Sequence, residues 1–183
     1  MRLLILLLSL ALATSLAQAQ LENELLLQNM PPGYKIGFQT KRGNMVMTEF
    51  VPEKESVENW TEMLTTQVFL GLTKPTPNEF RQVMQKSFER SCVGAQFADV
   101  AQATENGYSF EVWIQDCPKN EKTGKPERIW FKAIKGNDSF YLLQKAFRFR
   151  PEPEQVVRWT QYLRSVQVCD TRLPDRGCNQ RQQ

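Results

Sequence analysis

The sequence predicts an α+β fold in which an antiparallel β-sheet is flanked by helices. Segments of alternating apolar and polar residues recur in pairs separated by turn formers, which is typical of antiparallel hairpins. Two segments with helical spacing, one in the middle and one near the end, interrupt these strands. The later strands carry large apolar residues in both phases, so the sheet needs helical cover on both faces.

The first hairpin is expected over residues 34–51. Tyr34, Ile36 and Phe38 alternate with polar or small residues, and the turn sequence Lys41-Arg42-Gly43-Asn44 leads into a second strand. Before this hairpin, residues 22–27 have the composition of a helical turn, which the following prolines would end.

The middle of the chain contains the clearest helix start. Ser56 is a suitable N-cap and predicts a short helix after the first hairpin. Residues 61–72 are ambiguous, but their Thr-rich, β-branched centre favours a strand. Thr76-Pro77-Asn78-Glu79 then forms a capping box with proline at the first helical position. We expect this helix to run to about Ser91 with its apolar stripe facing the core.

Four strands and a final helix are expected in the second half of the chain. They fall at residues 93–104, 108–115, 128–135, 139–149 and 154–167. Asn106-Gly107 between the first two strands is typical of a type I′ hairpin turn. Ile129 and Phe131 lie in one phase of the third strand and Trp130 lies in the other, which again indicates cover on both faces.

Residues 1–19 have the layout of a secretory signal peptide. Arg2 provides the positive start, residues 3–12 form an apolar run, and Ala17-Gln18-Ala19 is a small-x-small cleavage site. The run is short for a bilayer span, and no later stretch approaches the ~18 apolar residues that a membrane helix needs. We therefore expect a protein without a transmembrane segment after signal cleavage, located in the periplasm or secreted.

The rest of the chain divides into three parts. Residues 20–32 form an N-terminal lead, residues 33–168 form a single α+β domain, and residues 169–183 form a polar C-terminal tail. Cleavage would remove only one charged residue, Arg2, and leave the chain weakly basic. Such a balance predicts no nucleic acid partner.

The four cysteines indicate two structural disulfides. An even cysteine count in an exported chain is typical of a disulfide framework, and four cysteines allow three connectivities. We favour Cys92–Cys117 near the open end of a hairpin and Cys169–Cys178 closing a short loop in the tail. A redox or metal site is the alternative, but there is no Cys-x-x-Cys spacing and no histidine to complete a zinc site.

Composition and motifs favour a non-catalytic protein. The chain has no histidine, so the commonest general base and metal ligand is missing. It contains neither a Gly-x-Ser-x-Gly elbow nor a glycine-rich phosphate loop. We predict no cofactor and no metal site. Paired carboxylates remain as an alternative, because Glu111 with Asp116, or Asp99 opposite them, has the residue types of a hydrolase acting on envelope polysaccharide.

Trp113 and Trp130 are the candidate binding residues. They fall in the polar phase of neighbouring strands, and if exposed together they would form an apolar patch for a ligand or partner. If the last helix covers them, they belong to the core. We favour the core, because Trp159 and Leu163 of that helix need a surface on which to pack.

The order of elements resembles the PsbP-like group, which includes DcrB-type periplasmic proteins. The resemblance covers about residues 33–166 and rests on the 34–51 hairpin followed by Ser56-Val57-Glu58-Asn59-Trp60. It implies a PsbP-like sandwich and an accessory or binding role without catalysis, and it transfers no site residue to this chain. The two cysteine pairs are a departure from the group.

Together these features predict a binding or accessory protein of the bacterial envelope. The expected partner is an envelope protein, bound through a sheet face or edge, or a small ligand. A carrier that holds a small apolar ligand between sheet and helices is the alternative binding role. The sequence leaves the oligomeric state open.

Overall fold

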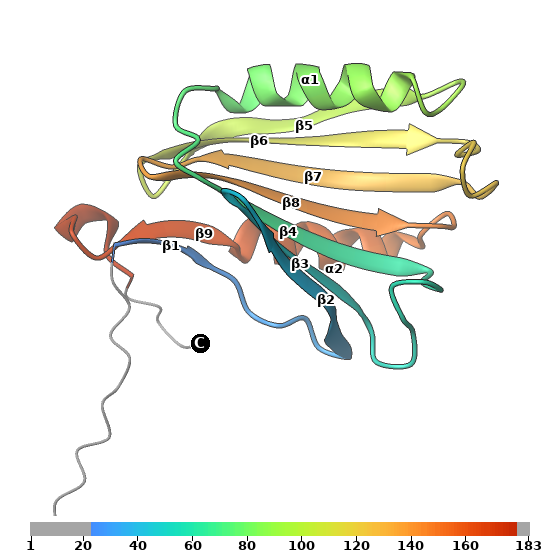
Figure 1. The fold of residues 1–183 in the computed structure, drawn as a ribbon, viewed down its shortest axis with the longest axis horizontal. Coiled ribbons are helices and arrows are strands. Elements are labelled where there is room, and N and C mark those ends of the chain that lie inside the picture. The colour runs from blue at the N-terminus through green and yellow to red at the C-terminus, as the bar shows by residue number, and fades with distance from the viewer. Residues whose placement is uncertain (1–22, 179–183) are drawn as a thin grey trace, which may run out of the picture.

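The computed structural model describes residues 23–178, so the expected signal peptide lies outside the described residues. A seven-stranded antiparallel sheet in the order β2-β3-β4-β8-β7-β6-β5 forms the body of the molecule (Figure 1). Its strands are β2 (Tyr34–Arg42), β3 (Met45–Pro52), β4 (Glu62–Leu70), β5 (Gln96–Glu105), β6 (Tyr108–Cys117), β7 (Glu127–Lys135) and β8 (Ser139–Phe147). The antiparallel α+β class predicted from the sequence is confirmed.

The two helices cover opposite faces of the sheet. Helix α1 (Pro77–Glu89) contacts β6 and β7, and helix α2 (Pro153–Ser165) lies behind the sheet in Figure 1. One core cluster under α1 includes Trp113 and Phe131, whereas another under α2 includes Trp130 and Phe147. Because successive residues of a strand point to opposite faces, one sheet supplies both cores.

Two local signals of the sequence are confirmed at the atomic level. The Thr76 side chain accepts a hydrogen bond from the Glu79 backbone N–H, and the Glu79 carboxylate accepts one from the Thr76 backbone. Asn106 and Gly107 both have positive φ, as a type I′ turn requires.

No helix within residues 23–178 is long and apolar enough to cross a membrane.

Two expectations about short segments are wrong. The expected helical turn at residues 22–27 is instead strand β1 (Glu24–Leu27). It pairs antiparallel with strand β9 (Gln167–Asp170), a segment that we expected to be the end of the last helix and the start of the tail. The short helix expected at Ser56 is a series of bends. Here the Glu55 carboxylate accepts hydrogen bonds from the backbone and hydroxyl of Thr61, which hold the chain in an open loop.

Both disulfides form with the favoured connectivity. Cys92–Cys117 joins the segment after α1 to the end of β6. Cys169–Cys178 closes a loop around the short 3₁₀ helix η1 (Pro174–Arg176). All four cysteines are therefore paired, and residues 169–178 of the tail fold back against the sheet, where the Arg176 guanidinium lies over the Tyr108 ring.

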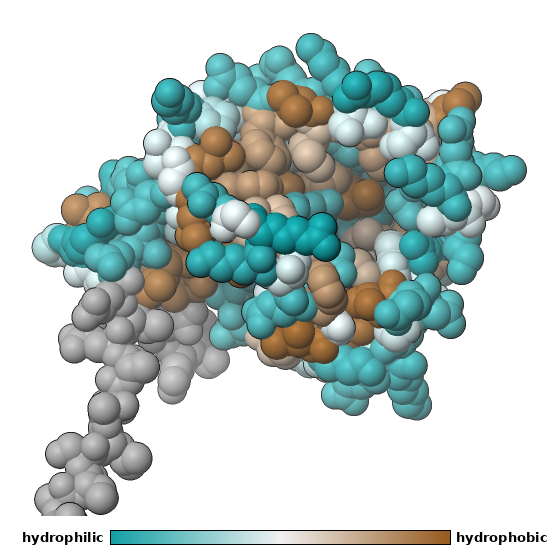
Figure 2. All heavy atoms as spheres, in the orientation of Figure 1, coloured by the Kyte–Doolittle hydropathy of each residue, from teal (hydrophilic) through white to brown (hydrophobic). Residues whose placement is uncertain are grey.

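The α1 face is hollowed between α1 and the outer strands. Figure 2 shows apolar side chains gathered in this hollow, with hydrophilic side chains around it. Met45, Met47 and Phe69 are half-buried there, because β3 and β4 turn these residues to the α1 face while α1 itself lies over β6 and β7.

Candidate functional site

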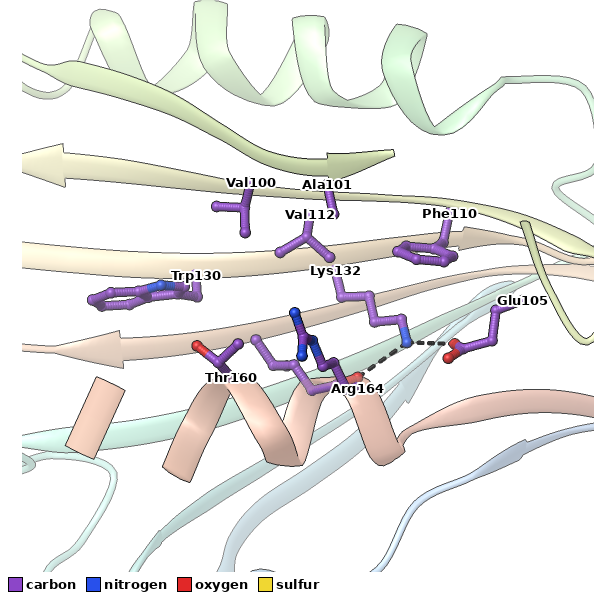
Figure 3. Close-up of a pocket in the computed structure, with 10 residues that line it drawn as sticks. Val100, Ala101, Glu105, Phe110, Val112, Trp130, Lys132, Thr160 and Arg164 are labelled. Atoms are coloured by element: carbon purple, nitrogen blue, oxygen red, sulfur yellow. Dashed lines mark hydrogen bonds and ion pairs between the residues drawn. The ribbon is translucent and has the colours of Figure 1, made fainter. Parts of the chain in front are cut away.

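A small cleft opens between α2 and the strands β5, β6 and β7 (Figure 3). Its volume is about 90 Å³. We call it the α2 cleft; it is lined by Val100, Ala101, Glu105, Phe110, Val112, Trp130, Lys132, Thr160, Leu163 and Arg164. The lining combines an apolar floor with Thr160 and Arg164 on the side of α2 and with the Lys132–Glu105 ion pair between the strands.

Strand alternation builds the apolar floor. Ile114 of β6 pairs with Trp130 of β7, so the two side chains point to the same face, which is the α2 face. Phe110 and Val112 lie in the same phase of β6 as Ile114 and therefore point there too. The Trp130 ring meets Phe147 edge to face, with 5.6 Å between ring centroids. A register shift between Asp99 and Ala101 then places Ala101, beside Val112, on the same face.

Lys132 closes one end of the cleft and is fully buried. Its ammonium donates hydrogen bonds to the Glu105 carboxylate at 2.7 Å and to the backbone carbonyls of Leu163 and Val166 at 3.0 and 2.8 Å. These carbonyls belong to the end of α2, where helix geometry leaves them without a backbone donor. Burial lowers the pKa of Lys132, and the Glu105 carboxylate opposes that effect. Lys132 therefore fixes the end of α2 to the sheet.

Arg164 and Thr160 lie at the helix side of the cleft. They come from successive turns of α2, and Figure 3 shows both beside the apolar floor. Arg164 is exposed and forms no ion pair within residues 23–178. Its charge is thus available to a ligand or a partner.

An uncovered strip of small apolar residues continues the cleft along β5. Ala98, Ala101 and Ala103 face the α2 side and are exposed, and Val100 at the register shift is 46% exposed. Strand β5 forms the last position of the sheet, and these four residues are exposed beside α2. The backbone groups on the outer side of β5 are therefore available for pairing.

The structure separates the two candidate tryptophans. Trp113 is fully buried on the α1 face and stacks on Phe131, with ring planes 6° apart. Trp130 is 6% exposed on the α2 face. The two residues lie on adjacent strands but on opposite sides of the sheet, so they form no joint patch. Only Trp130 reaches the α2 cleft.

The candidate carboxylates are each held by an arginine. Glu111 and Asp99 both bind Arg81 of α1 on the α1 face, and Glu111 is almost fully buried. Asp116 points to the opposite face and binds Arg128. Glu111 and Asp116 therefore cannot flank one bond of a substrate. Among the described residues, no group of three or more Cys, Asp or Glu side chains is placed to hold a metal ion.

The sequence did not single out Lys132, Lys145 or Arg164. A weak signal exists for the two lysines, because each falls in an apolar phase of a strand with large residues on both faces. Lysine is rarely fully buried, however, so strand phase alone favours an exposed position.

No protein-family model matches this chain, and no curated protein is significantly similar to it.

Proposed function

We propose that this chain is an exported, non-catalytic binding protein of the bacterial envelope that receives an extended segment of a partner protein along β5. The partner strand extends the sheet by antiparallel or parallel pairing, and one of its apolar side chains enters the α2 cleft above Trp130. Main-chain hydrogen bonds give such a complex affinity, and side-chain pockets give it specificity.

The observation that carries the proposal is the unpaired edge of β5, which is interrupted by the register shift between Asp99 and Ala101. Over ten residues the strand contains no lysine, arginine or proline, which are residues that block edge pairing. Its two acidic residues are already bound within the protein, Asp99 by Arg81 and Glu105 by Lys132. A partner strand therefore meets a neutral edge with small side chains that allow close approach.

The opposite edge of the sheet is protected. Strand β2 carries Lys35, Lys41 and Arg42 within nine residues. It also exposes Ile36 and Phe38, but charged side chains on an edge strand, lysine in particular, oppose the addition of a further strand. The difference between the two edges supports β5 as the edge that receives the partner strand.

The charge at the cleft specifies the partner further. Arg164 is exposed beside the apolar floor without a counter-ion in the described chain. An acidic residue near the apolar anchor of the partner segment would complete this pair. Interfacial charge pairs of this kind contribute mainly to specificity and association rate.

The disulfides and the fold class support a role outside the cytoplasm. Two disulfides are typical of proteins that fold in an oxidising compartment. Helices on both faces of an antiparallel sheet are compatible with the resemblance to the PsbP-like group, whose accessory, non-catalytic character agrees with this proposal.

A small-ligand carrier is the second candidate function. The α2 cleft lies between sheet and helix, as that alternative requires, but its volume of about 90 Å³ limits a ligand to a few heavy atoms. Typical ligand sites are several times larger, at roughly 300–1,000 Å³. A single inserted side chain suits the α2 cleft better.

Panning of a random peptide library on the purified protein tests the proposal. We expect enriched peptides to alternate apolar and polar residues, to contain an acidic residue, and to slow hydrogen exchange of the β5 amides. Ala101→Lys should abolish their binding, because it places a cation on the exposed edge beside the cleft.

Gln39→Lys is the matched control, since it adds the same charge to exposed β2. This variant should bind the enriched peptides as the unmodified protein does. Peptides that bind Ala101→Lys unchanged, or that protect β2 instead of β5, would show that β5 is not the binding edge. A library that yields no enriched peptide would argue for the small-ligand alternative.

A further inference from the structure

A second, larger pocket lies at the opposite side of α2. We call it the aromatic pocket; it is lined by Pro31, Pro32, Tyr34, Arg158, Trp159 and Tyr162 and has a volume of about 200 Å³. It shares no lining residue with the α2 cleft. Nothing in the proposed docking of a partner strand at β5 uses this pocket.

The walls of the aromatic pocket are formed by three planar rings that pack against one another. The Trp159 ring meets Tyr34 and Tyr162 edge to face, with centroid distances of 5.3 and 5.2 Å. Beneath it, the Lys145 ammonium lies 3.9 Å from the Trp159 ring centroid and donates a hydrogen bond to the Tyr34 hydroxyl. Planar walls held in this way favour a planar ligand ring, because aromatic rings bind each other in offset or edge-to-face contact.

The hydroxyl groups of the walls are already engaged. The Tyr34 hydroxyl donates to the Glu62 carboxylate at 2.7 Å. The Tyr162 hydroxyl donates to the Asn29 carbonyl and accepts from the Gln28 amide. A sugar, with many hydroxyl groups, would therefore find few partners here, whereas an apolar ring needs none.

One charged group of the pocket remains available. Arg158 is exposed and forms no ion pair within residues 23–178. Two carboxylates, those of Glu62 and Glu55, oppose the lowering of the pKa of neighbouring Lys145 by burial. Both are already bound within the protein, Glu62 by Lys145 and Glu55 by Thr61. Arginine binds carboxylates through paired N–H donors, so it is suited to an acidic ligand.

We infer that the aromatic pocket is a binding site for a small aromatic carboxylate. The ring lies among Tyr34, Trp159 and Tyr162, and the carboxylate pairs with Arg158. Such a ligand combines the two features that the pocket offers, a flat apolar space and an unused guanidinium. The site is independent of the proposed function at β5.

Titration with benzoate, followed by the NMR signals of the four tryptophan indoles, tests this inference. Through-bond assignment identifies Trp159, so this core residue need not be substituted. We expect benzoate to shift the Trp159 signal with a Kd of about 1–10 mM, in keeping with the affinity of very small ligands. Benzamide has the same ring without the charge, and acetate has the charge without the ring; both should bind at least about fivefold more weakly.

Arg158→Gln removes the charge at an exposed position and should weaken benzoate binding by about fivefold or more. Arg150→Gln, at an exposed arginine just before α2, is the matched control and should leave binding unchanged. The inference is overturned by the absence of a Trp159 shift, by equal binding of benzamide, or by an Arg158→Gln variant that binds benzoate normally. An equal loss in Arg150→Gln would indicate general attraction of anions to this side of the protein and would also overturn it. None of these outcomes bears on peptide binding at β5.

Discussion

Lys132 and Lys145 are both fully buried beneath α2, but the protein stabilises their charges in different ways. Lys132 donates to three oxygen atoms, two from backbone carbonyls at the end of α2 and one from Glu105, and one aromatic ring, that of Phe110, lies beside it. Lys145 has the Glu62 carboxylate and the Tyr34 hydroxyl, and aromatic rings of Tyr34, Phe147 and Trp159 surround the rest of the ammonium.

The comparison separates two roles of a buried cation. Lys132 supplies donors that the end of a helix needs, so its removal leaves backbone carbonyls without partners. Lys145 organises side chains at the aromatic pocket, and burial lowers its pKa to about 8 although Glu62 favours the charged form. The first lysine holds the fold, whereas the second positions the walls of a pocket.

Lys132→Met should have the largest effect on stability. Methionine retains the apolar stem but leaves the carbonyls of Leu163 and Val166 and the Glu105 carboxylate without their donor. We expect a loss of about 3–4 kcal/mol in the free energy of unfolding. Urea denaturation measures it, with exposed Lys54→Met as the control. A loss below about 1 kcal/mol would mean that water replaces the ammonium at the end of α2.

Lys145→Met should have a smaller effect, a loss of about 2 kcal/mol. The substitution leaves Glu62 without its cation, but the carboxylate keeps the hydrogen bonds from Tyr34 and Gln155 and remains partly exposed. Removal of a costly buried charge offsets part of the loss. The same denaturation experiment checks the order, and a larger loss than in Lys132→Met would reverse the comparison.

The pH dependence of stability should distinguish Lys145 directly. Its pKa is about 8 in the folded protein and near 10.5 in the unfolded chain, so between these values the unfolded chain binds more protons. Stability should therefore rise with pH, by about 1 kcal/mol between pH 8 and about 9.5. The lowered pKa of Lys132 acts in the same direction. Above about pH 10 the raised pKa of Tyr34 acts in the opposite direction and reduces stability.

Denaturation curves at several pH values measure this rise. In Lys145→Met the rise should be smaller, because only Lys132 remains to contribute. An equal rise in the variant and in the unmodified protein would assign the effect to other groups. Because all four cysteines are in disulfides, no free thiol is available to start exchange at alkaline pH.

Glu105→Gln should have the smallest effect, about 1 kcal/mol or less. Lys132 keeps both backbone carbonyls, and the glutamine side chain still offers an oxygen acceptor. Glu105 is also partly exposed, so solvent screens its charge. Thermal unfolding of the variant measures the change. A loss as large as that of Lys132→Met would show that the ion pair, rather than the helix carbonyls, explains the role of Lys132.

Most of the fold follows from local signals in the sequence. The capping box at Thr76 and the Asn106-Gly107 turn depend only on neighbouring residues, and both were predicted with the correct geometry. The favoured disulfide pairs also follow, because each cysteine lies close to a predicted hairpin end or loop. Strand β1 was missed because three consecutive leucines are compatible with a helix, and only pairing with distant β9 makes them a strand.

The candidate sites were predicted less well. Trp113 and Trp130 are both buried, as we favoured, but Trp130 lies under α2 whereas Trp113 lies under α1 rather than under the last helix. Face assignment depends on register, and a difference of one residue moves a side chain to the opposite face. Arg158 and Arg164 have no local pattern that separates them from ordinary surface arginines. Their importance depends on which pocket the packing of α2 places beside them.

The pairing of β1 with β9 has a consequence for the order of folding. Residues 24–27 leave the ribosome early in synthesis, and residues 167–170 leave it much later. The hairpins can form as they emerge, because their strands are close in sequence, whereas the two-stranded ribbon requires closure of a loop that spans nearly the whole described chain. This end of the protein should therefore stay open until β9 has been synthesised, and β9 then pairs with β1.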